Sequence, residues 1–109
     1  MDITRYTKIY FLGAGGIGMS ALARYFNHQK YAVYGYDKTA TPLTRALENE
    51  GIQMHYEDWG ERVSEAHQLT PDNTLVIRTP AVPSDFNELQ FLQASDFTIV
   101  KRAEVLGLI

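Results

Sequence analysis

KIYFLGAGGIGMS, residues 8 to 20, is the stretch that decides the fold class. Its first five residues form a nearly continuous apolar run, which is typical of a strand buried on both faces. Glycines follow in GxGxxG spacing at Gly13, Gly15 and Gly18, and a helical pattern then runs to His28. A glycine-rich turn between a buried strand and a helix is typical of nucleotide-binding βαβ units.

Each glycine of this loop has an expected task. Gly13 permits the tight turn, Gly15 removes a side chain where a phosphate must come close, and Gly18 lets the helix pack against the strand. The first helical N–H groups, around Gly16 to Met19, have no partners inside the helix, and the helix dipole adds partial positive charge. The loop therefore predicts a diphosphate site, and the alternative is a glycine-rich turn without a ligand.

Four more apolar runs follow, and each is short and bounded by turn-forming or polar residues. They span residues 31–36, 52–56, 74–77 and 97–100. Helical patterns lie between them: one starts at Thr41-Pro42 and stops at Gly51, a short one falls within 59–69, one is capped by Ser84 or Asp85, and a last one begins at Ala103. This alternation predicts an α/β fold, a Rossmann-like, doubly wound, five-stranded parallel sheet in three αβα layers.

Composition limits the classes of function. The 109 residues suit one domain, 45% of them are hydrophobic, and cysteine is absent, which excludes disulfides and thiolate metal sites. The net charge is −3, so no basic excess favours nucleic acid or an anionic membrane surface as a partner. No apolar stretch approaches the length of a membrane span. We expect a cytoplasmic protein whose phosphate ligand is attracted locally.

Asp37 ends the second apolar run, beside Lys38 and about 20 residues after the glycine loop. A carboxylate at this place usually meets a ribose hydroxyl or a base N–H, and the alternative is a solvated acid at a strand end. The residues leave the nucleotide open, because NAD, FAD and UDP-sugars can all place a diphosphate on such a loop.

Four stretches match a known family in order and spacing. They are GAGGIGMS at 13–20, YD at 36–37, TPAVP at 79–83 followed by NEL at 87–89, and KRAEVL at 101–106. Together they resemble the N-terminal domain of the Mur ligases, and in particular the members that join L-alanine to UDP-N-acetylmuramate. Two departures stand out: Pro80 removes a backbone donor from a position where the family often has Ser, and His55 lies elsewhere than the family's histidine.

The resemblance implies a three-domain ligase. In such an enzyme ATP and Mg²⁺ phosphorylate the lactyl carboxylate of UDP-N-acetylmuramic acid, and L-alanine attacks the acyl phosphate. Residues 1–109 would form the single N-terminal domain that holds the UDP end, with central and C-terminal domains as its partners. The chain has no GxxxxGK[ST] motif, so we expect no ATP, Mg²⁺ or other cofactor in this domain, which would bind and not catalyse. A stand-alone NAD-binding module or nucleotide sensor is the alternative.

The resemblance and the loop chemistry together give a substrate-binding set without catalytic or metal-binding residues. Its members are Ala14, Gly15, Gly16, Ile17, Gly18, Met19, Ser20, Asp37, Lys38, Thr79, Pro80, Ala81 and Val82. Ser20 either donates to a phosphate or caps and packs within the first helical turn.

Several other residues have expected places outside this set. Lys101 and Arg102 either reach a ligand, contact the next domain or form a solvated basic pair. We expect the three histidines, His28, His55 and His67, at the surface; Tyr31, Tyr34 and Tyr36 in strand packing; and Trp59 in the core or as a loop anchor.

Overall fold

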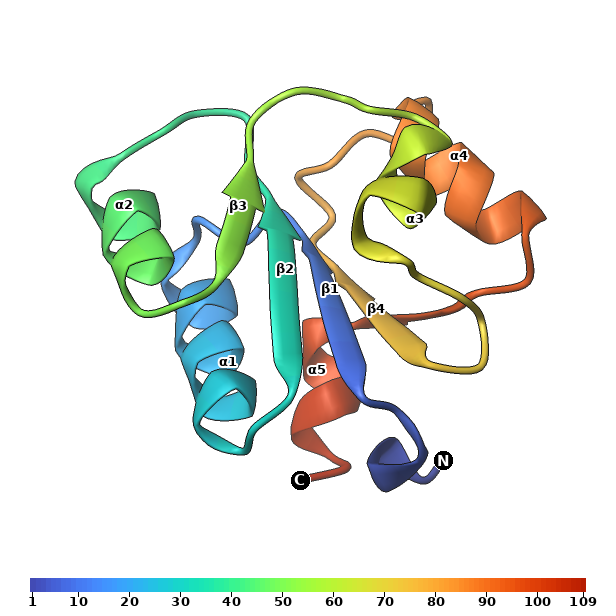
Figure 1. Cartoon of the computed structure of the whole chain (residues 1–109), viewed down its shortest axis with the longest axis horizontal. Coiled ribbons are helices and arrows are strands. Elements are labelled where there is room, and N and C mark those ends of the chain that lie inside the picture. The colour runs from blue at the N-terminus through green and yellow to red at the C-terminus, as the bar shows by residue number, and fades with distance from the viewer.

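Five parallel strands form the central sheet of the computed structural model, which describes residues 1–109 (Figure 1). The strands are β1 (Lys8–Leu12), β2 (Ala32–Tyr36), β3 (Gln53–His55), β4 (Thr74–Arg78) and β5 (Thr98–Lys101). Their order in the sheet is β3-β2-β1-β4-β5, so the chain winds outward in both directions from β1. The predicted doubly wound parallel sheet is confirmed.

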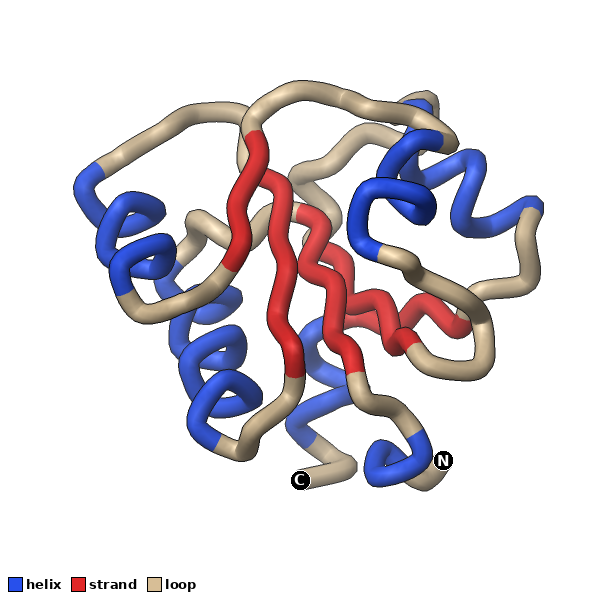
Figure 2. Tube along the Cα trace, in the orientation of Figure 1, coloured by secondary structure: helices blue, strands red, loops and turns tan.

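Helices cover both faces of this sheet (Figures 1 and 2). They are α1 (Ile17–His28), α2 (Pro42–Asn49), α3 (Arg62–His67), α4 (Asn87–Ala94) and α5 (Arg102–Leu106), with a 3-10 turn η1 at Ile3–Arg5. One core joins the sheet to α1, α2 and α5, and a second core joins the opposite face to α3 and α4. None of the helices combines the length and the hydropathy that a membrane crossing requires.

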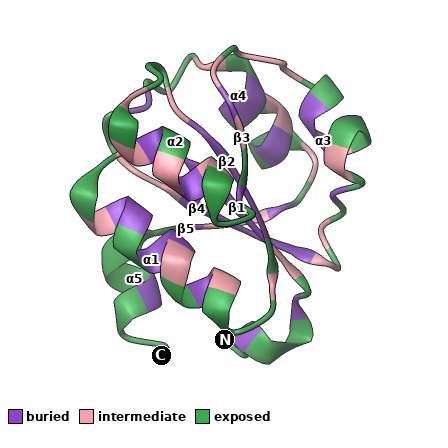
Figure 3. Ribbon diagram, turned by 60° about the vertical axis from the view of Figure 1, so that its left-hand side comes forward, coloured by how far each residue is buried: buried purple, intermediate pink, exposed green.

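Alternation along the central strand explains the two cores. Ile9 and Phe11 of β1 face α1 and α5, whereas Tyr10 and Leu12 face α3 and α4, and all four are fully buried. Buried residues are concentrated in the strands at the centre of the molecule (Figure 3). The central strand β1 is therefore apolar on both faces, as its continuous apolar run predicts, and β4 is buried in the same way. The edge strand β5 has only one neighbour, and only Val100 of its four residues is buried.

The turn after β1 depends on Gly13, which adopts the left-handed conformation with φ +95°. The N–H groups of Gly13 and Ala14 both donate to the Tyr36 carbonyl at the end of β2, at 2.8 and 2.9 Å. A Cβ at position 13 would collide with Cγ2 of Thr79, the first residue after β4. The turn thus brings the carboxyl ends of three strands together at one point.

The second helix begins as the sequence predicts. Thr41 Oγ1 accepts from the Thr44 N–H at 3.1 Å, and Thr44 Oγ1 accepts from the Thr41 N–H at 2.8 Å, with Pro42 in the first helical turn. This is a capping box in which a second threonine takes the usual place of Glu or Gln. Gly51, at φ +98°, follows the helix end.

The predicted start of α4 is wrong. Neither Ser84 nor Asp85 caps the helix; the carboxylate of Asp58 instead accepts from the N–H groups of Asn87 and Glu88, at 2.8 and 3.0 Å. Asp58 lies 29 residues before Asn87 in the chain. No local pattern can reveal such a cap, because only the folded chain brings the acid to the helix.

A buried carboxylate connects α4 to the sheet. Glu88 is fully buried, and its oxygens accept from the Tyr10 hydroxyl, from the Trp59 N–H at 2.8 Å and from His55 Nε2 at 2.8 Å. The His55 ring stacks on Trp59, with 3.8 Å between centroids. The expected surface position of His55 is therefore wrong, since a histidine that pairs with an acid can lie in a core. Trp59 anchors its loop, as expected.

The other aromatic and histidine residues follow the expectations more closely. His28 is exposed, and Tyr34 and Tyr36 pack on the α3 and α4 face of the sheet. His67 is half-buried, and this burial lowers the pKa of its imidazole below the ordinary value. Tyr31 precedes β2 and packs against the core that joins the sheet to α1, α2 and α5.

We predict that Gly13→Ala lowers the free energy of unfolding by about 2 kcal/mol or more, because it adds left-handed strain to a collision with Thr79. Chemical denaturation followed by circular dichroism measures this loss. Gly16→Ser is the matched control: its site is extended at φ −72° and open, and serine is a favourable N-cap. Equal stability of the two variants would contradict the role of the turn.

We also expect Glu88→Gln to lower the free energy of unfolding by about 2 kcal/mol or more. The amide of glutamine cannot accept all three donors that surround Glu88, and its own N–H₂ faces donors. Glu65→Gln makes the same change on the exposed surface of α3 and should leave the unfolding curve unchanged. The buried network is unimportant for stability if both variants unfold at the same denaturant concentration.

Candidate functional site

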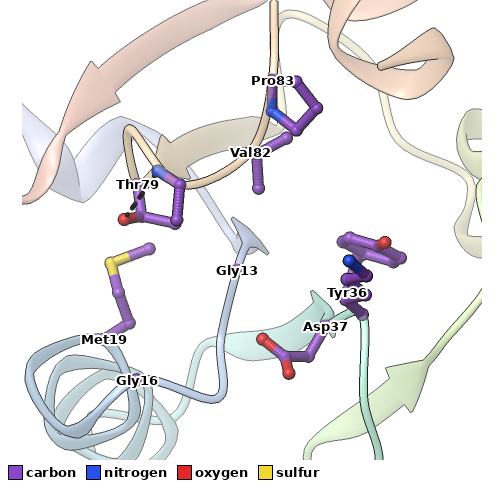
Figure 4. A pocket seen from close by; sticks show the side chains of 10 residues that line it. Gly13, Gly16, Met19, Tyr36, Asp37, Thr79, Val82 and Pro83 are labelled. Carbon is purple, nitrogen blue, oxygen red and sulfur yellow. Dashed lines mark hydrogen bonds between the residues drawn. The ribbon is translucent and has the colours of Figure 1, made fainter.

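A cavity of about 260 Å³ opens at the carboxyl ends of β1, β2 and β4, where the winding of the sheet changes direction (Figure 4). Its ten lining residues come from the end of β2, from the first turn of α1 and from the loops after the three strands: Gly13, Gly16, Met19, Tyr36, Asp37, Lys38, Thr79, Ala81, Val82 and Pro83. In Figure 4, Met19 and Thr79 lie on one side and Tyr36 and Asp37 on the other. Ligands of doubly wound sheets bind at this kind of place.

The glycine loop supplies unpaired donors to one edge of the cavity. The N–H groups from Gly16 to Met19 make no backbone hydrogen bond, and the first bond of the helix joins the Ser20 N–H to the Gly16 carbonyl at 2.8 Å. The first turn of α1 has no acidic residue and no side-chain cap. These amides and the positive end of the helix dipole form a site suited to an anion.

Asp37, the first residue after β2, contacts the glycine loop at Gly15. Its carboxylate accepts from the Gly15 N–H at 3.1 Å and from the Thr39 N–H at 3.4 Å. A Cβ at Gly15 would lie 2.7 Å from the carboxyl carbon. Gly15 therefore makes room for Asp37 in this structure, whereas the sequence had suggested room for a phosphate. Because like charges repel, an anion would bind nearer Gly16 to Met19 than Gly15.

The loop after β4 contributes surface and few donors. The Thr79 N–H donates to the Leu12 carbonyl at 3.1 Å, the Val82 N–H to the Thr79 carbonyl at 3.2 Å, and the Ala81 N–H to Thr79 Oγ1 at 3.4 Å. Pro80 has no N–H to offer. This wall can shape the cavity with its side chains, but its backbone N–H groups are already bonded within the protein.

Seven residues of the predicted set line the cavity, namely Gly16, Met19, Asp37, Lys38, Thr79, Ala81 and Val82. The other six lie beside it: Ala14, Gly15, Ile17, Gly18, Ser20 and Pro80. Ala14 is fully buried, and Ile17 is 86% exposed. The Ser20 hydroxyl is buried and donates to the Ile17 carbonyl at 3.0 Å, which corresponds to packing within the first helical turn.

Tyr36 is the main lining residue that the sequence did not indicate. Its ring packs in the core beside Phe86, with 4.6 Å between centroids, and also borders the cavity. Burial raises the pKa of Tyr36, and the nearby charges of Glu88 and Asp37 act in the same direction. The phenol therefore keeps its proton and can donate a hydrogen bond. Its place next to Asp37 at the strand end was the only available signal.

The third glycine has an unexpected neighbour. The three heavy atoms closest to a Cβ built at Gly18 all belong to the side chain of Arg102, with Nε at 2.5 Å and Cζ at 2.8 Å. The sequence predicted that this glycine lets the helix pack against a strand. The structure instead places the first residue of α5 against the first turn of α1.

Comparison with known proteins identifies the family. The family model described as "Mur ligase family, catalytic domain" matches residues 8–109. The UDP-N-acetylmuramate--L-alanine ligase of Parabacteroides distasonis is 52% identical over 107 residues, which cover 98% of this chain and 23% of the relative. The same enzyme of Christiangramia forsetii is 48% identical over 108 residues, covering 99% of this chain and 24% of the relative. The chain thus spans about a quarter of these relatives.

Solved structures agree in fold. The UDP-N-acetylmuramate-alanine ligase of Thermotoga maritima superposes with a TM-score of 0.75 at 32% identity, over 91% of this chain and 21% of that one. The UDP-N-acetylmuramate:L-alanyl-gamma-D-glutamyl-meso-diaminopimelate ligase of Neisseria meningitides gives a TM-score of 0.79 at 17% identity, over 93% of this chain and 30% of that one. The match over residues 8–109 shows that the chain belongs to the Mur ligase family.

Proposed function

We propose that residues 1–109 bind the UDP end of UDP-N-acetylmuramic acid, as the N-terminal domain of a cytoplasmic ligase that adds L-alanine to this substrate. The observation that carries the proposal is the row of free N–H groups from Gly16 to Met19 at the edge of the cavity. The likeness to UDP-N-acetylmuramate--L-alanine ligases supports the choice of a uridine diphosphate over other nucleotides.

In this proposal the diphosphate lies on the amides of Gly16 to Met19. Asp37 and the protonated Tyr36, on the opposite side of the cavity, face the uridine and accept from or donate to it. The loop at Thr79 to Val82 closes the third side. Ile17 and Gly18 contribute only their backbone amides, whereas Ala14, Gly15, Ser20 and Pro80 act by holding these loops in place.

Such a domain contributes to the reaction by positioning. A substrate held at its UDP end has fewer orientations available to its lactyl arm, which lowers the entropic part of the barrier to amide formation. The reacting groups would come from the central and C-terminal domains of the ligase, and the isolated domain would bind without catalysing.

ATP and Mg²⁺, which the resemblance assigns to the complete ligase, do not fit these residues. The chain has no GxxxxGK[ST] motif, and no three of its His, Asp or Glu side chains are grouped so that they could hold a metal ion. The proposed binding role of this domain requires neither ATP nor Mg²⁺.

We expect UDP and UDP-N-acetylmuramic acid to raise the melting temperature of the chain, and NAD to leave it unchanged. At one hundred times the dissociation constant a ligand stabilises the folded state by about 2.7 kcal/mol, which differential scanning fluorimetry detects. A shift with NAD and none with either uridine nucleotide would contradict the proposal and favour a dinucleotide module.

Gly15→Ala tests the location of the site. Its Cβ would displace the Asp37 carboxylate, so the shift with UDP should fall while the unliganded protein stays folded. Gly107→Ala, at the end of α5 and with φ −77°, is the control that should keep the full shift. An undiminished shift in Gly15→Ala would remove the loop from the site.

A further inference from the structure

The side chain of Arg102 packs against Gly18, in the first turn of α1. Arg102 is the first residue of α5, directly after β5, and its side chain crosses to the first turn of α1. A Cβ on Gly18 would be 2.5 Å from its Nε, 2.8 Å from its Cζ and 3.2 Å from its Cδ. The guanidinium therefore rests against helix backbone that only a glycine leaves uncovered.

This position is electrostatically unfavourable for a cation. The N-terminus of a helix carries partial positive charge, so Arg102 faces a like charge there. Arg102 takes part in none of the ion pairs of the chain, whereas Arg24 pairs with Glu50 at 2.9 Å and Arg45 with Glu48 at 3.0 Å. The first turn of α1 contains no acid that could compensate. An anion between the guanidinium and the free amides would satisfy both.

The cavity itself supplies no other net positive charge. Its charged lining residues are Asp37 and Lys38, whose formal charges cancel. Gly18 stands in α1 between Gly16 and Met19, which both line the cavity, so the guanidinium lies beside the edge at which the amides are free. The planar guanidinium donates in a fork that matches two oxygens of one phosphate.

We propose that Arg102 binds the phosphate oxygens of the nucleoside diphosphate and makes the site specific for it over the bare nucleoside. Gly18 is glycine in order to seat this side chain. The inference rests on the proposed function, because it assigns one more ligand-binding residue to the same site. The 101–106 stretch is then part of the substrate site.

Isothermal titration of the 109-residue chain with UDP and with uridine tests the assignment. Arg102→Gln should raise the dissociation constant for UDP about tenfold, reduce its dependence on salt, and leave uridine binding within about twofold. Arg5→Gln changes the net charge equally at the opposite end of β1 and should leave both ligands unaffected. Equal loss of UDP and uridine in Arg102→Gln would overturn the proposal, because it would indicate a general disturbance of the site.

The variant Gly18→Ala tests the contact between Gly18 and Arg102 independently. Its methyl group would push the flexible end of Arg102 away, so this variant should reproduce the loss of UDP affinity with the fold retained by circular dichroism. The double variant Gly18→Ala/Arg102→Gln should bind UDP no more weakly than either single variant, since both substitutions remove the same contact. Additive losses of UDP affinity would show that Gly18 acts independently of Arg102, and would contradict the claim that Gly18 makes room for this side chain.

The two proposals can fail separately. Binding of neither UDP nor UDP-N-acetylmuramic acid by the unmodified chain contradicts the proposed function, and the assignment of Arg102 with it. Tight binding of UDP that Arg102→Gln leaves unchanged contradicts only the assignment. Inorganic pyrophosphate as a further titrant shows whether Arg102 recognises the diphosphate itself: the variant should weaken its binding too, and unchanged pyrophosphate binding would argue against direct phosphate contact.

Discussion

Gly13 ends β1 in a left-handed conformation, and this single backbone state sets the direction of α1. The two N–H groups at positions 13 and 14 attach the turn to the end of β2, and the missing Cβ admits Thr79 from the end of β4. Three strand ends therefore meet around one residue. The cavity exists because these ends meet, and the free amides of α1 border it because the turn brings the N-terminus of the helix there.

The face of the sheet covered by α3 and α4 holds a buried hydrogen-bond network around Glu88. A fully buried carboxylate, Glu88, is stable only because Tyr10, His55 and Trp59 all donate to it. Burial and the charge of Glu88 both raise the pKa of the Tyr10 phenol, which keeps that donor protonated. Asp58, in the same loop as Trp59, holds the start of α4. The loop, the helix and the sheet are thereby locked together behind the wall of the cavity that Tyr36 forms.

Local charge, and not the charge of the whole chain, makes the site suitable for an anion. The chain carries a net charge of −3, yet the first turn of α1 contains no acid and has Arg102 against it. Asp37 binds the Gly15 amide and so divides the loop into an acidic end and an electropositive end. A ligand with a diphosphate at one end and hydrogen-bonding groups at the other matches this division.

Short-range chemistry allowed much of this to be predicted. The buried runs, the GxGxxG turn and the Thr41-Pro42 helix start depend on residues within a few positions of one another, and strand alternation with helices implies a parallel sheet. The resemblance to Mur ligases lay in contiguous motifs, and the family match over residues 8–109 confirms it. The position of Asp37 at the end of β2 followed from the same local pattern.

Long-range contacts settled what the sequence left open. Asp58 caps a helix 29 residues away, Glu88 draws His55 into the core, and Arg102 lies on Gly18 although most of the chain separates them. Tyr36 became a wall of the cavity, and Gly15 proved to accommodate a carboxylate. The sequence by itself determined the elements and their order, because propensity and periodicity act locally; tertiary structure decided which charges meet, because only chain crossings bring distant side chains within hydrogen-bonding reach.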